Sequence, residues 1–135
     1  MSSAAATLQP SARKIGRPLR ILYAEDVREL REVARMALSL DGHQIECALD
    51  GQLALNRVTT APDAFDLVIT DHHMPNMNGL EFVEHLRAMK WPGKIIVFSS
   101  ELKDEVRVAY LALKVDGVLP KPIFPSELRR VLAEL

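Results

Sequence analysis

The sequence predicts an α/β fold: a doubly wound, five-stranded parallel sheet with helices on both faces. Short apolar runs that end in polar or acidic residues alternate five times with segments of helical spacing. The apolar runs lack a helical period, which is typical of strands buried on both faces. Parallel neighbours need crossover connections, and these are right-handed almost without exception, so the alternation places helices on both sides of the sheet.

Five strands are predicted, and each is short and mostly apolar. They cover residues 21–24, 43–49, 65–70, 94–99 and 117–119. Four of the helices are predicted from apolar residues three or four positions apart, beginning at Leu30, Phe82, Leu102 and Leu128. The other helix is predicted over residues 51–60, with Asp50 as its cap.

Two pairs of residues resemble capping boxes, in which side chains satisfy the free amide groups at the start of a helix. Asp26 is followed three residues later by Glu29, and Asn78 is followed in the same way by Glu81. Both pairs precede segments of helical spacing. They therefore predict where the first and third helices begin.

Composition predicts one domain, over residues 19–135. The chain has 135 residues, 48% hydrophobic and 26% charged, which suits a single hydrophobic core. Residues 1–18 are rich in Ser, Ala and Pro and carry three basic residues but no acid, so we expect a flexible leader, with a basic docking arm as the alternative.

Charge and cysteine content narrow the function classes. Lys plus Arg total 17 and Asp plus Glu total 18, so the net charge of -1 gives no reason to expect nucleic-acid binding. A single cysteine, Cys47, excludes an internal disulfide and a cysteine-rich zinc module, and it fits a reducing compartment. No apolar run approaches the length of a membrane-spanning helix. We expect a cytoplasmic domain without membrane contact.

Acidic and polar residues follow the predicted strands. Glu25 and Asp26 follow the first strand, Asp71 the third, Ser99 ends the fourth, and Lys121 follows the fifth. Ligands of open parallel sheets bind beyond the carboxyl ends of the strands. Three carboxylates crowded there repel one another unless a cation or an ammonium group offsets their charge.

Oxygen ligands of this density favour a hard divalent ion, and Mg²⁺ in particular combines one or two carboxylates with water and phosphate oxygens. The sequence therefore predicts a site for phosphate chemistry. The alternative interpretation makes Asp26 only a helix cap and Glu25 only a solvated acid.

Four segments resemble the signature segments of receiver domains in two-component response regulators. They are residues 23–26 (YAED), 69–79 (ITDHHMPNMNG), 97–100 (VFSS) and 119–122 (LPKP). The resemblance covers residues 20–135. It implies a flavodoxin-like (βα)5 fold with strand order 2-1-3-4-5. It also implies a regulatory domain rather than an enzyme, one that catalyses only its own phosphoryl transfer and dephosphorylation.

The resemblance implies roles for the site residues. Asp71 would take a phosphoryl group from a phosphohistidine of a sensor histidine kinase or phosphotransfer protein. Glu25, Asp26, Asp71 and the backbone carbonyl of His73 would hold Mg²⁺. Lys121 and Ser99 would contact phosphoryl oxygens, and the bond between Lys121 and Pro122 is expected to be cis.

The resemblance also implies a switch. Ser99 would move inward on phosphorylation and draw with it the loop that leads to the fourth helix. The output surface for an unknown downstream protein would comprise the fourth helix, the strand over 117–119 and the last helix. Val118 stands where family members often carry Tyr or Phe, so this chain departs from the aromatic part of the switch. The side chains of His73 and Glu101 would flank Asp71 and tune the rates of phosphorylation and hydrolysis.

The side chains of the paired histidines 72 and 73 are interpreted as exposed loop groups, and neither imidazole is expected to bind a metal or to carry a phosphoryl group. Adjacent residues point in different directions, and no third soft ligand is nearby in the sequence.

Three other functions compete with the receiver interpretation. A phosphatase with an aspartyl nucleophile would need a second acid two residues after Asp71, where the chain has His73. A nucleotide-binding module would need a glycine-rich turn after the first strand, and residues 25–28 contain no glycine. A pseudo-receiver that acts only by docking or dimerisation is favoured by Val118 and disfavoured by the retained acids and Lys121. The domain would act either alone, signalling by docking, or within a longer regulator or hybrid kinase.

Overall fold

The structure is a computed structural model, and it describes residues 7–8, 17–100 and 102–135. Five parallel strands form the body of the sheet in the order β3-β2-β4-β5-β6. Their bounds are β2 Arg20–Ala24, β3 Gln44–Ala48, β4 Leu67–Asp71, β5 Lys94–Ser99 and β6 Gly117–Pro120. When the five parallel strands are numbered 1 to 5 by their position in the chain, they lie in the sheet in the order 2-1-3-4-5. The predicted topology is therefore confirmed.

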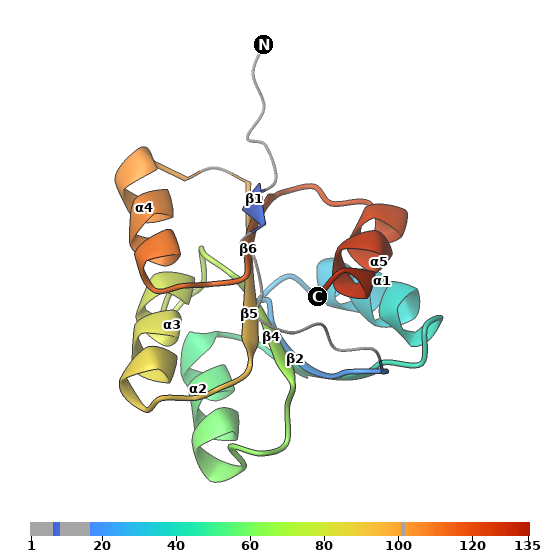
Figure 1. The fold of residues 1–135 in the computed structure, drawn as a ribbon, viewed down its shortest axis with the longest axis horizontal. Helices are drawn as coiled ribbons and strands as arrows, with labels where there is room; N and C mark the ends of the chain where they lie inside the picture. The colour runs from blue at the N-terminus through green and yellow to red at the C-terminus, as the bar shows by residue number, and fades with distance from the viewer. Residues whose placement is uncertain (1–6, 9–16, 101) are drawn as a thin grey trace.

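In the part of the chain that the structure describes, five helices cover the sheet. They are α1 Arg28–Ser39, α2 Gly51–Thr60, α3 Gly79–Ala88, α4 Asp104–Ala112 and α5 Pro125–Ala133. Helices α2, α3 and α4 lie on one face, and α1 and α5 lie on the other (Figure 1). The helices on both faces confirm the doubly wound prediction. Among the described residues, no helix combines the length and the apolar character needed to cross a membrane.

A short sixth strand was not predicted. Thr7 and Leu8 form β1, Thr7–Leu8, which pairs antiparallel with Val118 and Gly117 of β6 (Figure 1). These two residues fall within the segment that the sequence predicts to be a flexible leader. Pairing with an open sheet edge uses backbone groups alone, so a side-chain pattern does not reveal it. The rest of that leader, apart from Arg17 and Pro18, lies outside the described residues.

Two apolar layers hold the sheet between the helices. Strand β4 is buried along its whole length, since every residue from Leu67 to Asp71 is buried. Its side chains alternate between the two layers: Val68 packs with Phe82 and Leu86 of α3, whereas Ile69 packs with the layer under α1 and α5. This burial fixes the carboxyl end of β4, where Asp71 lies.

The helix starts agree with two of the three predicted caps. Asp50 caps α2 by accepting from Leu53 N, and Asn78 forms a capping box with Glu81. The predicted box of Asp26 and Glu29 is wrong. Helix α1 begins at Arg28 with Val27 as its cap, and no side chain caps it. The reason is positional: Asp26 lies two residues before the helix, within the acidic cluster described next.

Candidate functional site: an acidic cluster at the carboxyl edge of the sheet

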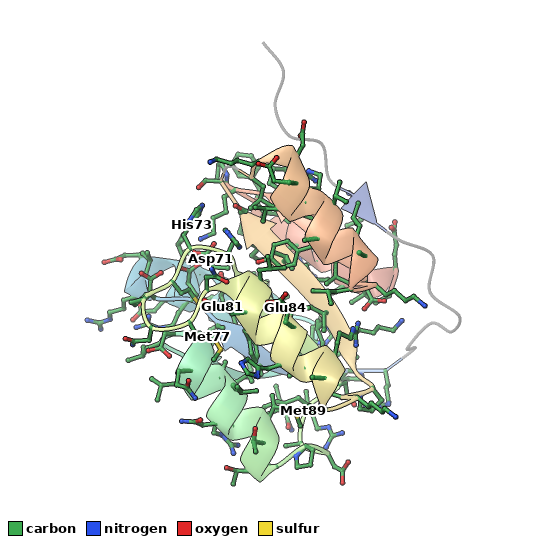
Figure 2. All side chains as sticks on the ribbon, turned by 90° about the vertical axis from the view of Figure 1, so that its left-hand side faces the viewer. Asp71, His73, Met77, Glu81, Glu84 and Met89 are labelled. Carbon is green, nitrogen blue, oxygen red and sulfur yellow. The ribbon has the colours of Figure 1, made fainter. Side chains whose placement is uncertain are left out.

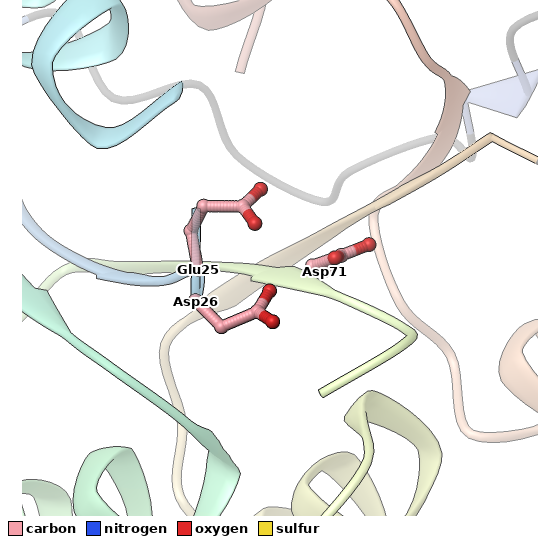
Figure 3. Close-up of side chains that lie close together, drawn as sticks. All are labelled: Glu25, Asp26 and Asp71. Atoms are coloured by element: carbon pink, nitrogen blue, oxygen red, sulfur yellow. The ribbon is translucent and has the colours of Figure 1, made fainter. Parts of the chain in front are cut away.

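Three carboxylates converge where β2 and β4 end. The two strands are parallel neighbours, with Ala24 opposite Thr70, so the residues that follow them meet at one edge. Ligand oxygens of Glu25, Asp26 and Asp71 all lie within 4.8 Å of one another. Figure 3 shows the three side chains together, two from the end of β2 and one from the end of β4.

Glu25 is fully buried, with an exposure of 0%. Its carboxylate accepts hydrogen bonds from Lys121 Nζ at 2.7 Å, Val27 N at 3.2 Å and Tyr23 Oη at 3.3 Å. Burial raises the pKa of Glu25, while the ammonium group of Lys121 opposes that rise. The alternative of Glu25 as a solvated acid is therefore wrong. Its carboxylate is an internal part of the site.

Lys121 joins Glu25 to Asp71. Its Nζ lies 2.7 Å from Oε1 of Glu25 and 3.2 Å from Oδ2 of Asp71. Burial alone would lower the pKa of Lys121, but the hydrogen bonds and charges of the two carboxylates outweigh it and raise the pKa. The lysine follows β6, and its backbone N donates to Ser99 O at 2.8 Å. Its peptide bond to Pro122 is cis, as expected.

Asp71 ends β4 with an exposure of 5%, whereas Asp26 is exposed. The two carboxylate oxygens of Asp71 have different partners. Oδ1 accepts from the backbone N of His72 at 2.8 Å, and Oδ2 faces Lys121. The carboxylate is therefore held in one orientation at the base of the cluster, while Asp26 lies on its solvent side.

The structure places the other predicted site residues as follows. Ser99 is buried at the end of β5, which pairs with β4 and β6, so it lies at the same edge. His73 is exposed, and Figure 2 shows it beside Asp71. Val118 is buried within β6. Glu101 lies outside the described residues.

His72 corrects one expectation. It is 9% exposed rather than an exposed loop residue, because its ring turns inward against α4. Its Nδ1 lies 2.6 Å from the hydroxyl oxygen of Tyr110. Neither Tyr110 nor the hydroxyl of Tyr23 was predicted to contact residues of this region. Each is an aromatic residue within a predicted element, and the pattern of its own element identifies it only as core.

The donor set fits a magnesium ion. Three carboxylates meet one ammonium group, so an excess of negative charge remains for a divalent cation to offset. Oxygen ligands, with one carboxylate exposed to solvent, match an ion that keeps several water molecules.

A parallel α/β sheet with acids, a lysine and a serine at its carboxyl edge defines a class of protein: receiver domains that signal by phosphorylation. The sequence comparisons agree, because residues 21–133 match the family described as "Response regulator receiver domain". The chain belongs to this family. Receiver domains are regulatory, interact with sensor kinases or phosphotransfer proteins, and generally bind Mg²⁺ through an acidic cluster.

Individual relatives support the assignment. The response regulator MprA of Mycolicibacterium vanbaalenii is 39% identical over 111 residues, which are 82% of this chain and 47% of MprA. The sensor histidine kinase AruS of Pseudomonas aeruginosa is 36% identical over 121 residues, 87% of this chain and 12% of the kinase. The chain thus spans about half the length of one relative and a small part of the other.

Solved structures give the same fold. The chemotaxis protein CheY4 of Vibrio cholerae matches with a TM-score of 0.77 and 30% identity, over 85% of this chain and 96% of CheY4. A response regulator receiver protein of Pseudomonas putida matches with a TM-score of 0.76 and 25% identity, over 87% of this chain and 97% of that protein.

Proposed function

We propose that the domain accepts a phosphoryl group onto Asp71 from a phosphohistidine of a sensor histidine kinase or phosphotransfer protein, in a Mg²⁺-dependent reaction. The observation that carries the proposal is the position of Lys121, whose ammonium group contacts both Glu25 and Asp71 beside a third carboxylate. A structural ion pair needs one acid. Two acids on one ammonium group, with a third acid beside them, suit a site that also holds a divalent cation, and the cation and the ammonium group together can offset the charge of a phosphoryl group.

The transfer itself needs a nucleophile and a leaving group. A carboxylate oxygen of Asp71 attacks phosphorus, the bond between phosphorus and the donor imidazole nitrogen breaks, and the imidazole leaves with the electron pair and takes up a proton. Lys121 and Ser99 stabilise the charge on the peripheral phosphoryl oxygens. Glu25, Asp26, Asp71 and the carbonyl of His73 would hold the Mg²⁺ that shares this task.

An apolar groove beside the site suits a protein donor. It lies between α1 and α5, has a volume of about 310 Å³, and its lining includes Val33, Leu128 and, at the end next to the site, Lys121. The groove is therefore continuous with the site. We assign it to the protein that brings the phosphohistidine. The cytoplasm is the expected location, and the free thiol of Cys47 is compatible with it.

The change in the partner-binding surface follows from the new contacts that the phosphoryl group makes. Phosphorylation brings a charge of roughly -1.5 to -2 to Asp71. Ser99 would move toward the phosphoryl group and alter the surface of α4, β6 and α5. Val118 offers no aromatic ring for this change. His73 and Glu101 would tune the rates from the rim. A docking module without phosphorylation gains no support, because the acids and Lys121 converge.

The test is phosphorylation by a small donor. The chain is incubated with acetyl phosphate, with Mg²⁺ or with a chelator, and its intact mass is measured. We expect a gain of one phosphoryl group with Mg²⁺, little gain with the chelator, and none in Asp71→Asn. Asp63→Asn removes an exposed acid from the loop before β4 and should behave like the wild type. An equal gain in Asp71→Asn would overturn the proposal.

A further inference from the structure

The side chain of His72 connects the loop that follows Asp71, residues 72–78, to α4, and we call this segment the acceptor loop. Its Nδ1 lies 2.6 Å from the hydroxyl oxygen of Tyr110, and the two rings meet edge to face, with centroids 5.5 Å apart. Tyr110 has an exposure of 0%. Both partners are thus withdrawn from water, where a hydrogen bond is costly to leave unmade.

The same residue is bonded to the phosphoacceptor. The backbone N–H of His72 donates to Oδ1 of Asp71 at 2.8 Å. In an acyl phosphate the negative charge lies on the phosphoryl oxygens, and the carboxyl oxygens of Asp71 no longer carry it. Hydrogen bonds to charged acceptors are roughly twice as strong as those to neutral ones. Phosphorylation of Asp71 therefore changes the strength of the bond that holds the backbone of His72.

Tyr110 is well placed to pass such a change to α4. Among the described residues of α4 it is the one that is buried, and no side chain caps the start of the helix. The space around its hydroxyl is tight, because a Cβ added at Gly79 would lie 2.7 Å from that oxygen and 2.3 Å from Asp71 O. A shift of the acceptor loop must therefore move or release the ring.

The far end of α4 is held separately. Arg87 of α3 donates to the carbonyl oxygens of Leu113 and Lys114, at 2.7 and 3.0 Å. Helices α3 and α4 lie side by side in Figure 2, with Asp71 and His73 near the beginning of α3. The two residues that follow α4 are thereby fixed to α3, while its last turn is fixed to the loop after Asp71 through Tyr110.

We propose that Tyr110 is a positioning residue which, through its hydrogen bond to His72, makes the stability of α4 depend on the phosphorylation of Asp71. The inference rests on the proposed function of Asp71. It adds a second route to α4, separate from the movement of Ser99, and it gives His72 a role that the paired histidines do not suggest.

The test measures hydrogen exchange of the α4 amides before and after phosphorylation with acetyl phosphate and Mg²⁺. In the wild type we expect the exchange rates to change by about fivefold, the factor that one net hydrogen bond contributes to a local opening equilibrium. In Tyr110→Phe and in His72→Leu the change should fall below about twofold. His72→Asn, whose amide can occupy the position of Nδ1, should restore part of it.

His43→Leu is the matched control. The Nδ1 of His43 accepts a partly buried hydrogen bond from Leu19 N at 2.8 Å, but His43 precedes β3 and so lies at the opposite edge of the sheet. This variant should keep the wild-type change. An undiminished change in both Tyr110→Phe and His72→Leu would overturn the inference.

The intact masses separate the two proposals. Absence of a mass gain in the wild type would defeat the proposed function and the inference together. If the mass gain is normal and phosphorylation still changes α4 exchange in Tyr110→Phe and His72→Leu as in the wild type, the inference fails and the proposed function stands. Loss of phosphoryl uptake in Tyr110→Phe and His72→Leu, with uptake kept in His43→Leu, would make the contact part of the acceptor site and overturn its role as a link.

Discussion

Lys121 forms an ion pair with the fully buried carboxylate of Glu25, with Nζ 2.7 Å from Oε1, although the two residues are 96 positions apart in the sequence. The pair joins the end of β2 to the residue that follows β6, across the two strands between them. Removing one member of such a pair leaves the other charge buried without compensation, which costs more than the pair contributes.

We therefore expect Lys121→Met to lower the free energy of unfolding by about 2–4 kcal/mol in metal-free buffer. Urea denaturation measures the change. Lys103→Met, at the exposed start of α4, should stay within about 0.5 kcal/mol of the wild type. Equal effects of the two substitutions would show that Lys121 does not compensate a buried charge.

Magnesium should stabilise the folded domain, because an ion that binds only the native state shifts the folding equilibrium by mass action. At a free Mg²⁺ concentration ten times the dissociation constant, the free energy of unfolding rises by about 1.4 kcal/mol. Asp26→Asn removes one of the three carboxylates and should lose most of this gain, whereas Asp63→Asn should keep it. Thermal unfolding with and without Mg²⁺ provides the comparison, and a full gain in Asp26→Asn would remove Asp26 from the metal site.

Gly79→Ala should damage both stability and phosphorylation. Its Cβ would lie 2.3 Å from Asp71 O and 3.0 Å from His72 Cα, so the acceptor loop must shift. We expect the free energy of unfolding to fall by about 1–3 kcal/mol and phosphoryl uptake to become slower.

Gly42→Ala is the control for this substitution. Gly42 has a φ of +81°, so alanine costs about 1–2 kcal/mol there, but among the described residues the atom nearest to its Cβ would be Cγ of Pro18, at an ordinary contact distance of 3.7 Å. Phosphoryl uptake should stay normal in Gly42→Ala. Normal uptake in Gly79→Ala as well would show that the close contact does not constrain Asp71.

The carboxylate of Asp66 predicts a pH-dependent contribution to stability. It accepts hydrogen bonds from Arg17 and from both the side chain and backbone N of Arg20. Burial alone would raise the pKa of Asp66, but the hydrogen bonds from Arg20 and Arg17 outweigh it and lower the pKa far below its ordinary range. A lowered pKa in the folded state stabilises the protein above the ordinary pKa of about 4, and the benefit is lost as the pH falls further.

Asp66→Asn should therefore cost about 1–3 kcal/mol near neutral pH. The difference from the wild type should shrink at pH values below about 4, because the wild-type carboxylate then loses its advantage. Urea unfolding of both proteins at several pH values measures the cost near neutral pH and its decrease in acid. A difference that grew on acidification would contradict this assignment of the Asp66 hydrogen bonds.

Sequence alone could predict which residues meet at the site, for a geometric reason. Parallel strands end at one edge, so Glu25, Asp71 and Lys121 had to converge once the strands were recognised. The start of α3 could also be predicted, because Asn78 and its capping partner Glu81 are only three residues apart. Both inferences depend on periodicity or short separations.

Contacts between distant elements could not be predicted. His72 and Tyr110 are 38 positions apart, and the helical pattern around Tyr110 says only that the ring faces inward. The backbone pairing of Thr7 with Val118 follows no side-chain pattern. The burial of Glu25 likewise involves Lys121, which follows β6 and is 96 positions away, and a strand-end motif does not specify this contact.

The identity of the phosphorylated residue is the central claim about this domain. After reaction with acetyl phosphate and Mg²⁺, borohydride reduction converts a phosphorylated aspartate to homoserine, which tandem mass spectrometry locates. We predict homoserine at position 71 and at no other aspartate. Homoserine elsewhere, or a phosphoryl group retained on His72, His73 or Ser99 with Asp71 intact, would contradict the account.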